Sequence, residues 1–303
     1  MKIISAQQIE ELHISPEICI KWVSEAFKIK IASKLPAKIP IHPVGNDFIT
    51  TMPCLLPEEY KTFGVKIVSR KTGRVPALRS DLMLMDSDSG SIKALINADW
   101  ITTMRTGAVA ALAIKTLRNS QTSDYSLIGL GNTAYSTMLC LLNIFPNEHL
   151  KVRLFKYKNQ AEKFIQKFSS FSNVTFTIVN TIEDLVKNTD VLISCITEAK
   201  DLIVTDESLF KTGVLVVPVH TRGFQNCDLF FDKVFADDTN HVKGFKYFSY
   251  FKKYGEISDV LNKKIEGRTS DSERILSYNV GIALHDIYYA NMIYNHLINI
   301  KEL

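Results

Sequence analysis

The alternation of apolar and polar positions changes in character along the chain. Ser15 followed by Pro16 predicts a helix start, and apolar residues recur at helical spacing after it. Between residues 39 and 98 short apolar runs are separated by turn residues, and the runs 82–85 and 92–96 flank an Asp/Ser/Gly-rich turn that is typical of a hairpin. The first third of the chain is therefore expected to hold helices followed by a largely antiparallel sheet.

A long helix rich in small residues is predicted over 99–117, and its composition would allow close packing on a neighbouring element. After residue 124 short β-rich runs alternate with helical stretches, as in a parallel, doubly wound sheet. The predicted strands are 125–128, 152–157, 174–179, 191–195, 214–219 and 233–236, and the predicted helices are 133–144, 160–168, 182–186 and 207–210. A last amphipathic helix is expected over 280–297.

These patterns predict an α/β fold with two domains. A Rossmann-type doubly wound parallel sheet would form a dinucleotide-binding domain from residues 119–279. Residues 1–118 together with 280–303 would form a second α+β domain with a largely antiparallel sheet. This domain would bind the substrate and mediate dimerisation. A length of 303 residues agrees with two domains better than with one.

Composition excludes several classes of protein. Apolar residues make up 46% and charged residues 22%, and 36 basic against 32 acidic side chains give a net charge of only +4, so we expect no nucleic-acid partner. No stretch approaches the roughly 18 apolar residues of a membrane span, and the N-terminus lacks a signal-peptide pattern. Five scattered cysteines without CxxC spacing, and no HExxH motif, indicate a cytoplasmic protein without a metal site.

The most basic local run, residues 241–254, is rich in Lys, Tyr and Phe. A solvated loop explains such a run, and a contact for an anionic ligand is the alternative.

A glycine motif follows the first strand of the alternating region. Gly129 allows a tight turn and Gly131 lets the backbone approach a pyrophosphate, while Asn132 and Thr133 open the next helix. Ala134 permits close packing of that helix on the strand. The strand–turn–helix context favours a dinucleotide site over an unliganded turn.

The next strand ends without the acid that reads the ribose of NAD. Lys156 and Lys158 stand there instead, and they favour NADP slightly over NAD, unless both side chains only face water.

Two cations lie in otherwise apolar surroundings. Lys66 interrupts an apolar strand, and Arg105 lies in the small-residue helix. Both need partners if they are buried, and a substrate carboxylate is a good partner for an arginine. A lysine at a strand edge and a structural ion pair are the alternatives.

Four segments in this order resemble the ornithine cyclodeaminase/mu-crystallin family. They are Gly-Val-Lys-Ile-Val at 64–68, Thr-Met-Arg-Thr-Gly-Ala at 103–108, Gly-Leu-Gly at 129–131 and Val-Gly-Ile-Ala-Leu-His-Asp at 280–286. The resemblance covers nearly the whole chain. It implies a homodimer, a catalytic domain closed by the final helix, and a central Rossmann domain.

The resemblance also implies roles for single residues. Lys66 would handle a proton or contact the substrate carboxylate, and Arg105 would clamp that carboxylate. The implied substrate contacts include Lys38, Thr50 and Met52, and the implied cofactor contacts include Thr106, Thr197, Val219 and His220.

This sequence departs from the cyclodeaminase pattern at three polar positions. Lys38 stands where cyclodeaminases carry an arginine, Thr50 replaces a glutamate, and Arg222 falls where they carry a catalytic aspartate. Arg222, or His220 beside it, would suit a substrate with a second carboxylate or a neutral side chain. The alternative is that Arg222 points away and pairs with Asp228 or Asp232.

The interpretation that we favour is an NAD(P)(H)-dependent oxidoreductase acting at the C–N bond of a small amino or imino acid. A true ornithine cyclodeaminase, which uses NAD catalytically, is the first alternative. An NADPH-binding protein without turnover, like mu-crystallin in a sequestering role, is the second. The sequence names neither the substrate nor the direction of the reaction.

Overall fold

A computed structural model describes residues 1–196, 199–220 and 222–299 of the chain. Contacts between Cα atoms divide the chain into two compact units. Unit 1 comprises Met1–Arg105 and Gly281–Leu303, and unit 2 comprises Thr106–Val280. The change of unit falls inside the helix α3 (Asp99–Leu117), which has the same bounds as the predicted small-residue helix.

Unit 1 contains a six-stranded sheet in the order β1-β6-β5-β4-β3-β2. Its neighbours pair antiparallel except for the parallel pair β1–β6, so the expected largely antiparallel sheet is confirmed. The strands are β1 (Lys2–Ile4), β2 (Ile39–Ile41), β3 (Phe48–Leu55), β4 (Thr62–Arg70), β5 (Leu78–Asp86) and β6 (Ile92–Asn97). The predicted hairpin is the pair β5–β6.

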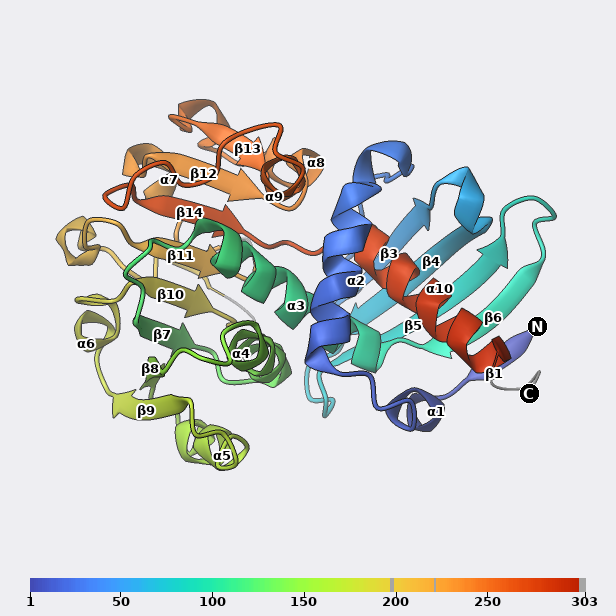
Figure 1. Cartoon of the computed structure of the whole chain (residues 1–303), viewed down its shortest axis with the longest axis horizontal. Coiled ribbons are helices and arrows are strands. Elements are labelled where there is room, and N and C mark those ends of the chain that lie inside the picture. Colours follow the sequence, from blue (N-terminus) through green and yellow to red (C-terminus); the bar gives the residue numbers. More distant parts are fainter. Residues whose placement is uncertain (197–198, 221, 300–303) are drawn as a thin grey trace. The chain divides into compact units, whose positions relative to one another are not determined.

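Helices α2 and α10 cover one face of this sheet (Figure 1). The unit holds α1 (Ala6–Glu10), α2 (Pro16–Lys28), α10 (Ala283–Asn299), and the 3-10 turns η1 (Lys30–Ala32) and η2 (Glu58–Tyr60). The last helix thus begins three residues later than predicted, because Gly281 takes a left-handed backbone with φ of 82°. A β-carbon on Gly64 would lie 2.6 Å from Ile287 Cδ1, so this glycine lets α10 lie close against β4.

The opposite face of the same sheet exposes apolar side chains. Because side chains alternate along a strand, the positions next to the buried ones point to this face. Ile49 and Ile67 are 42% and 46% exposed, and Leu95 is 40% exposed. Further members are Ile3, Ile39 and Ile41.

Unit 2 contains an all-parallel eight-stranded sheet in the order β13-β12-β14-β11-β10-β7-β8-β9. The strands are β7 (Asp124–Ile128), β8 (Leu150–Phe155), β9 (Val174–Val179), β10 (Val191–Ser194), β11 (Leu215–Pro218), β12 (Lys233–Ala236), β13 (Tyr254–Glu256) and β14 (Ile275–Tyr278). The run β9-β8-β7-β10-β11 has the order 3-2-1-4-5 of a Rossmann sheet, which confirms the predicted fold class.

The helices of unit 2 include α4 (Asn132–Ile144), α5 (Gln160–Gln166), α6 (Ile182–Val186), α7 (Cys227–Phe230), α8 (Thr239–Val242) and α9 (Ile257–Leu261), with 3-10 turns η3 (Glu207–Leu209) and η4 (Phe248–Tyr250). The helix predicted over 207–210 is therefore only the short turn η3. In the described part of the chain no helix is both long enough and apolar enough to cross a lipid bilayer.

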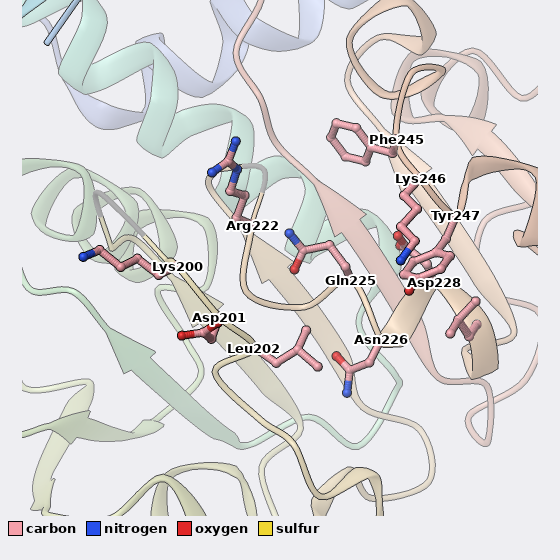
Figure 2. Close-up of a pocket in the computed structure, with 11 residues that line it drawn as sticks. Lys200, Asp201, Leu202, Arg222, Gln225, Asn226, Asp228, Phe245, Lys246 and Tyr247 are labelled. Carbon is pink, nitrogen blue, oxygen red and sulfur yellow. The ribbon is translucent and has the colours of Figure 1, made fainter. Parts of the chain in front are cut away.

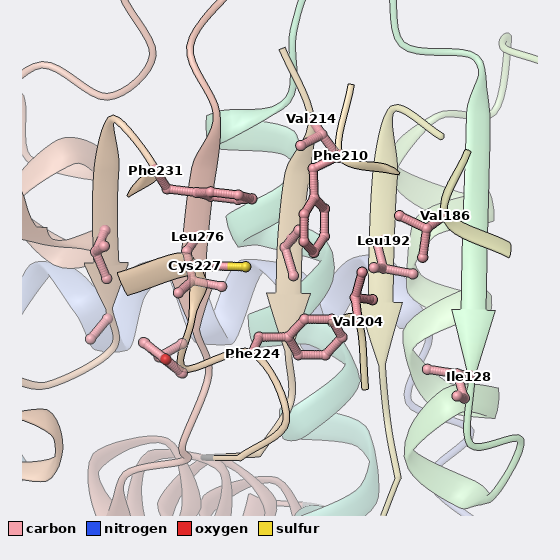
Figure 3. Packing of buried hydrophobic residues seen from close by; sticks show 14 of the residues in the cluster. Ile128, Val186, Leu192, Val204, Phe210, Val214, Phe224, Cys227, Phe231 and Leu276 are labelled. Carbon is pink, nitrogen blue, oxygen red and sulfur yellow. The ribbon is translucent and has the colours of Figure 1, made fainter. Parts of the chain in front are cut away.

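Three phenylalanines outside the regular helices and strands of unit 2 belong to its buried core. Phe210, Phe224 and Phe231 pack with aliphatic side chains of the strands, and all three are at most 1% exposed (Figure 3). In a second contact within the unit, a β-carbon on Gly107 of α3 would lie 2.4 Å from the Ser136 carbonyl carbon of α4. The small residues of α3 therefore serve close packing against α4.

Candidate active site and dinucleotide site

A buried ionic cluster lies in unit 1 where β4, α3 and α10 meet. Asp286 Oδ1 lies 2.8 Å from Lys66 Nζ and accepts a hydrogen bond of 2.9 Å from Arg105 Nε. Lys66 and Asp286 are fully buried, and Arg105 is 5% exposed. The structure thus brings together the two cations singled out in the sequence and adds a carboxylate between them.

The surroundings of Lys66 lower its pKa toward neutral pH. Burial and the neighbouring Arg105 guanidinium lower the pKa of Lys66 to about 7, although Asp286 acts in the opposite direction. Lys38 also lowers this pKa, so its positive charge lies within electrostatic reach of Lys66. A lysine with such a pKa can donate and accept a proton near neutral pH.

Local backbone geometry makes room for the cluster. A β-carbon on Gly281 would lie 2.4 Å from one terminal nitrogen of Arg105, so the glycine leaves space for the guanidinium. His285 packs edge-on against Phe27 at 4.5 Å, and burial lowers the pKa of His285 well below its usual range. His285 is therefore neutral and does not compete for Asp286.

The other predicted substrate residues share the Lys66 face of the sheet. Met52 is directly opposite Lys66 in the β3–β4 register, and Thr50 lies two residues before it on the same buried face. The pairing of β3 with β4 thus places both beside the lysine. Lys38 directly precedes β2 and is half-buried.

In unit 2 the predicted glycine turn has the geometry that a dinucleotide site needs. Gly129 has φ of 83°, and a β-carbon there would lie 2.5 Å from the Ile196 nitrogen. Gly131 has open space around its missing β-carbon and caps α4, which begins with Asn132 and Thr133. The first N–H groups of α4 are therefore open to a phosphate, and this chain fits a dinucleotide here.

The position of this turn within the sheet points to the same conclusion. It follows β7, and β7 pairs with β10, where the strand order reverses. Open α/β sheets bind ligands outside the carboxyl ends of the strands at this switch point. Ala134 is fully buried, as close helix–strand packing requires.

The loop after β11 is tied back to β10. Val219 N donates to the Ser194 carbonyl, and His220 Nε2 lies 2.7 Å from Ser194 Oγ. His220 Nδ1 accepts from the Arg222 backbone N–H at 3.3 Å, which makes Nε2 the protonated nitrogen. Burial lowers the pKa of His220 to about 4, so this side chain is neutral at physiological pH.

Arg222 is exposed and has no ion pair with any described residue. Asp228 Oδ1 accepts instead from the Tyr278 hydroxyl, and Asp232 accepts from the Arg274 backbone N–H. The alternative, a pairing of Arg222 with one of these aspartates, is therefore absent from the described part of the chain.

The remaining predicted cofactor residues have different positions. Lys156 and Lys158 are exposed just beyond the end of β8, which is next to β7 in the sheet. Thr106 follows Arg105 on α3. Thr197 lies outside the described residues.

Asp286 is the residue of the cluster to which sequence reasoning gave no role. A signal was present, because an acid within an otherwise apolar helix needs a buried partner. The identity of that partner depends on the approach of α10 to β4, which no local pattern reveals.

Comparisons with known proteins agree with this geometry. A family model described as "Ornithine cyclodeaminase/mu-crystallin family" matches residues 1–301. The nodulation efficiency protein NfeD of Rhizobium meliloti is 27% identical over 273 residues, which cover 86% of this chain and 83% of that protein. The N-((2S)-2-amino-2-carboxyethyl)-L-glutamate dehydrogenase of Staphylococcus aureus is 26% identical, over 82% of this chain and 78% of that protein.

Two solved structures share the fold. The Thermococcus litoralis Delta(1)-pyrroline-2-carboxylate reductase, in complex with NADH and L-proline, has a TM-score of 0.86 at 22% identity and covers 99% of this chain and 98% of its own. An archaeal alanine dehydrogenase dimer with bound NAD has a TM-score of 0.84 at 22% identity and covers 100% and 97%. The family's characterised members include such NAD(P)-dependent oxidoreductases. This chain therefore belongs to the ornithine cyclodeaminase/mu-crystallin family.

Proposed function

We propose that the chain is an NAD(P)(H)-dependent oxidoreductase that acts at the C–N bond of a small amino or imino acid. The observation that carries this proposal is the buried Lys66, held between Asp286 and Arg105 with a pKa lowered to about 7. A protein that only binds a ligand has no need of a lysine kept ready for proton exchange at neutral pH.

The residues of unit 1 would divide the work at the substrate. The Arg105 guanidinium uses its Nε edge for Asp286, and its other edge suits a carboxylate. Lys38 would add a second positive charge. Lys66 Nζ would give a proton to the substrate nitrogen during reduction and take one during oxidation.

Unit 2 would hold the dinucleotide. The turn from Gly129 to Ala134 would receive the pyrophosphate, and the neutral His220 with Val219 would line the nicotinamide side. When bound, the nicotinamide supplies or takes up the two electrons of the reaction. Unit 1 would then be the substrate and dimerisation domain and unit 2 the dinucleotide-binding domain.

The preference for NADPH and the location in the cytoplasm are two more specific proposals. The structural relatives contain NADH and NAD, so the slight preference for NADPH is supported only by Lys156 and Lys158. The five cysteines form no disulfide within the described part of the chain, which suits the reducing cytoplasm.

A homodimer is proposed on the exposed apolar face of the unit 1 sheet. Apolar side chains gathered on one face, here with Ile49, Ile67 and Leu95, are typical of an interface. Light scattering should give twice the chain mass, and Ile67→Glu should shift it toward the monomer. A monomer mass for the unaltered protein at all concentrations contradicts the proposal.

The central experiment is a screen of NADH and NADPH oxidation with 2-oxo acids and amines. We expect net turnover on at least one pair and loss of that turnover in Lys66→Ala. Formation of proline from ornithine without net turnover would indicate a cyclodeaminase. Tight coenzyme binding without any reaction would indicate a binding protein.

A further inference from the structure

A pocket within unit 2 includes no residue of the Lys66 cluster and none of the glycine turn. Its volume is about 660 Å³, which lies in the range of small-molecule sites. Three segments line it: one after β10, one that runs from the loop after β11 into α7, and one after α8 (Figure 2). The residues are Lys200, Asp201, Leu202, Arg222, Gln225, Asn226, Asp228, Leu229, Phe245, Lys246 and Tyr247.

Two of the three segments that line the pocket are joined to each other by hydrogen bonds. The Ile203 N–H donates to the Gly223 carbonyl at 2.8 Å, and Asn226 Nδ2 donates to the Val204 carbonyl at 3.0 Å. A β-carbon on Gly223 would lie 2.5 Å from Ile203 Cδ1, so the two loops lie in direct contact. Beneath them Phe224 belongs to the buried core of the unit. A preformed site of this kind loses little conformational entropy on binding.

One buried polar atom in the pocket lacks a partner. Asp228 is 1% exposed, and Oδ1 accepts from the Tyr278 hydroxyl at 2.8 Å, but Oδ2 has no hydrogen bond. Burial raises the pKa of Asp228 to about 7. Buried polar groups are normally satisfied, so Oδ2 is a place for a ligand atom. When protonated, this carboxyl can donate a hydrogen bond to an anion.

The charged side chains around the pocket favour a negatively charged ligand. Three cations, Lys200, Arg222 and Lys246, stand against the two carboxyls of Asp201 and Asp228. None of the three cations has an ion pair with a described residue. Lys246 Nζ lies 4.9 Å from the centre of the Tyr247 ring.

Apolar side chains complete the lining. Leu202 and Leu229 are 38% and 43% exposed, and Phe245 is half-buried. They would cover an apolar body next to the charged group. The basic run 241–254, which the sequence left between a solvated loop and an anion contact, contributes three of the lining residues.

We propose that this pocket binds a small organic anion, a carboxylate or phosphate attached to an apolar body, with Lys246 on the charged group and Asp228 Oδ2 as a second polar contact. The site lies wholly within unit 2, and its two proposed polar contacts, Lys246 and Asp228, have no role in the proposed oxidoreductase function.

Binding of simple probes to the full-length protein tests the proposal. We would titrate 4-phenylbutyrate and phenyl phosphate at millimolar concentration by ligand-observed NMR, with phenethylamine and phenethyl alcohol as the cationic and neutral counterparts. We expect one or both anions to bind at least tenfold more tightly than the amine and the alcohol. The two anionic arms decide between a carboxylate and a phosphate.

A pair of lysine variants from the same run localises the binding. Lys246→Glu should weaken the bound anion at least tenfold, whereas Lys243→Glu should change it less than twofold, because Lys243 bonds Asn240 and does not line the pocket. The proposal is overturned if both variants lose binding equally or if Lys246→Glu binds the anion unchanged. It is also overturned if the protein prefers the amine or binds neither anion.

Asp228→Asn provides a second, independent measurement. The amide keeps an acceptor for Tyr278 and presents a donor at the position of Oδ2 at every pH. Binding of the anion to the unaltered protein should weaken above pH 7, and the variant should lose that dependence. An identical pH dependence in both proteins would remove Asp228 from the site.

Discussion

Asp286 Oδ1 lies 2.8 Å from Lys66 Nζ, and both side chains are fully buried. An aspartate on the last helix thus meets a lysine from a strand 220 positions earlier in the chain. The same oxygen accepts from Arg105, so one carboxylate compensates two buried cations. Burial, and after it the charge of Arg105, outweighs this single negative charge, so the pKa of Lys66 remains lowered.

The pH dependence of activity follows from this cluster. Reduction of an imine needs Lys66 protonated, so its rate should fall about tenfold per unit as pH rises past about 7. Oxidation of an amine needs the neutral lysine, so its rate should rise with pH through the same region. Initial rates in both directions from pH 5.5 to 9 measure this. Profiles that run in parallel for the two directions would contradict the role of Lys66.

Asp286→Asn should alter this profile in a defined direction. Asp286 raises the pKa of Lys66, so its removal should shift the pH limb to lower pH. It also leaves Arg105 without its buried partner, and we expect kcat/KM to fall by about 100-fold or more. Glu17→Gln, at an exposed position on α2, is the control and should leave both unchanged. A loss of rate without a shifted limb would mean that Asp286 acts only through stability.

Gly107→Ala tests the contact between α3 and α4. The added carbon would lie 2.4 Å from a backbone carbon at Ser136 and 2.6 Å from the Thr137 nitrogen, and backbone atoms cannot move aside cheaply. The free energy of unfolding should drop by about 3 kcal/mol, measured by urea denaturation. Gly244→Ala has open space and should change it by less than about 0.5 kcal/mol. Equal stability of the two variants would show that α3 has room to shift.

The fold was predictable where local pattern and packing agree. The bounds of α3, β9 and β12 match the prediction because apolar runs there are set off by turn or polar residues. The prediction missed β14, which lies between β11 and β12 in the sheet. Only the five-residue helix α9 lies between β13 and β14. The sequence pattern therefore lacks the longer helix of a βαβ unit, which would indicate that another strand follows.

The candidate site was predictable in part. Lys66 and Arg105 stand out because charges in apolar segments need partners. Asp286 gained no role, because its meeting with Lys66 depends on Gly64 letting α10 approach β4. The pocket beside Asp228 combines three segments that are spread over residues 200–247, and no spacing along the chain reveals such a cavity.

The relative affinities for NADPH and NADH test the role of the exposed Lys156 and Lys158. If Lys156 and Lys158 meet a 2′-phosphate, NADPH should bind at least as tightly as NADH, and replacing both by alanine should weaken NADPH by about tenfold. NADH affinity should change less than twofold. Titration of nicotinamide fluorescence measures both, and Lys163→Ala on α5 serves as a surface-charge control. A preference for NADH that the double variant does not alter removes the argument for NADP.

Ornithine is the substrate on which the departures at Thr50 and Arg222 bear most directly. Ring closure needs the distal ammonium held and deprotonated, and a carboxylate does both. The resemblance places Arg222 where cyclodeaminases carry their catalytic aspartate, and Arg222 has no anionic partner among the described residues that would cancel its charge. Thr50 supplies a hydroxyl where they carry a glutamate. Loss of a charge-assisted bond costs roughly 1.5–3 kcal/mol, and a like charge adds to it.

We therefore expect proline formation from ornithine to be at least 100-fold slower than net nicotinamide turnover on the preferred substrate, measured by amino-acid chromatography and by absorbance. Arg222→Asp should narrow that gap, because it restores an acid at the distal end, while Arg222→Gln, which removes the charge alone, should narrow it less. Lys66→Ala should abolish both reactions and leave dinucleotide binding near normal, because the lysine and the glycine turn belong to different units. Rapid proline formation by the unaltered protein would show that Arg222 does not occupy the aspartate's place. Asp228, buried and with a free carboxylate oxygen, would then be the first residue to test as the missing acid.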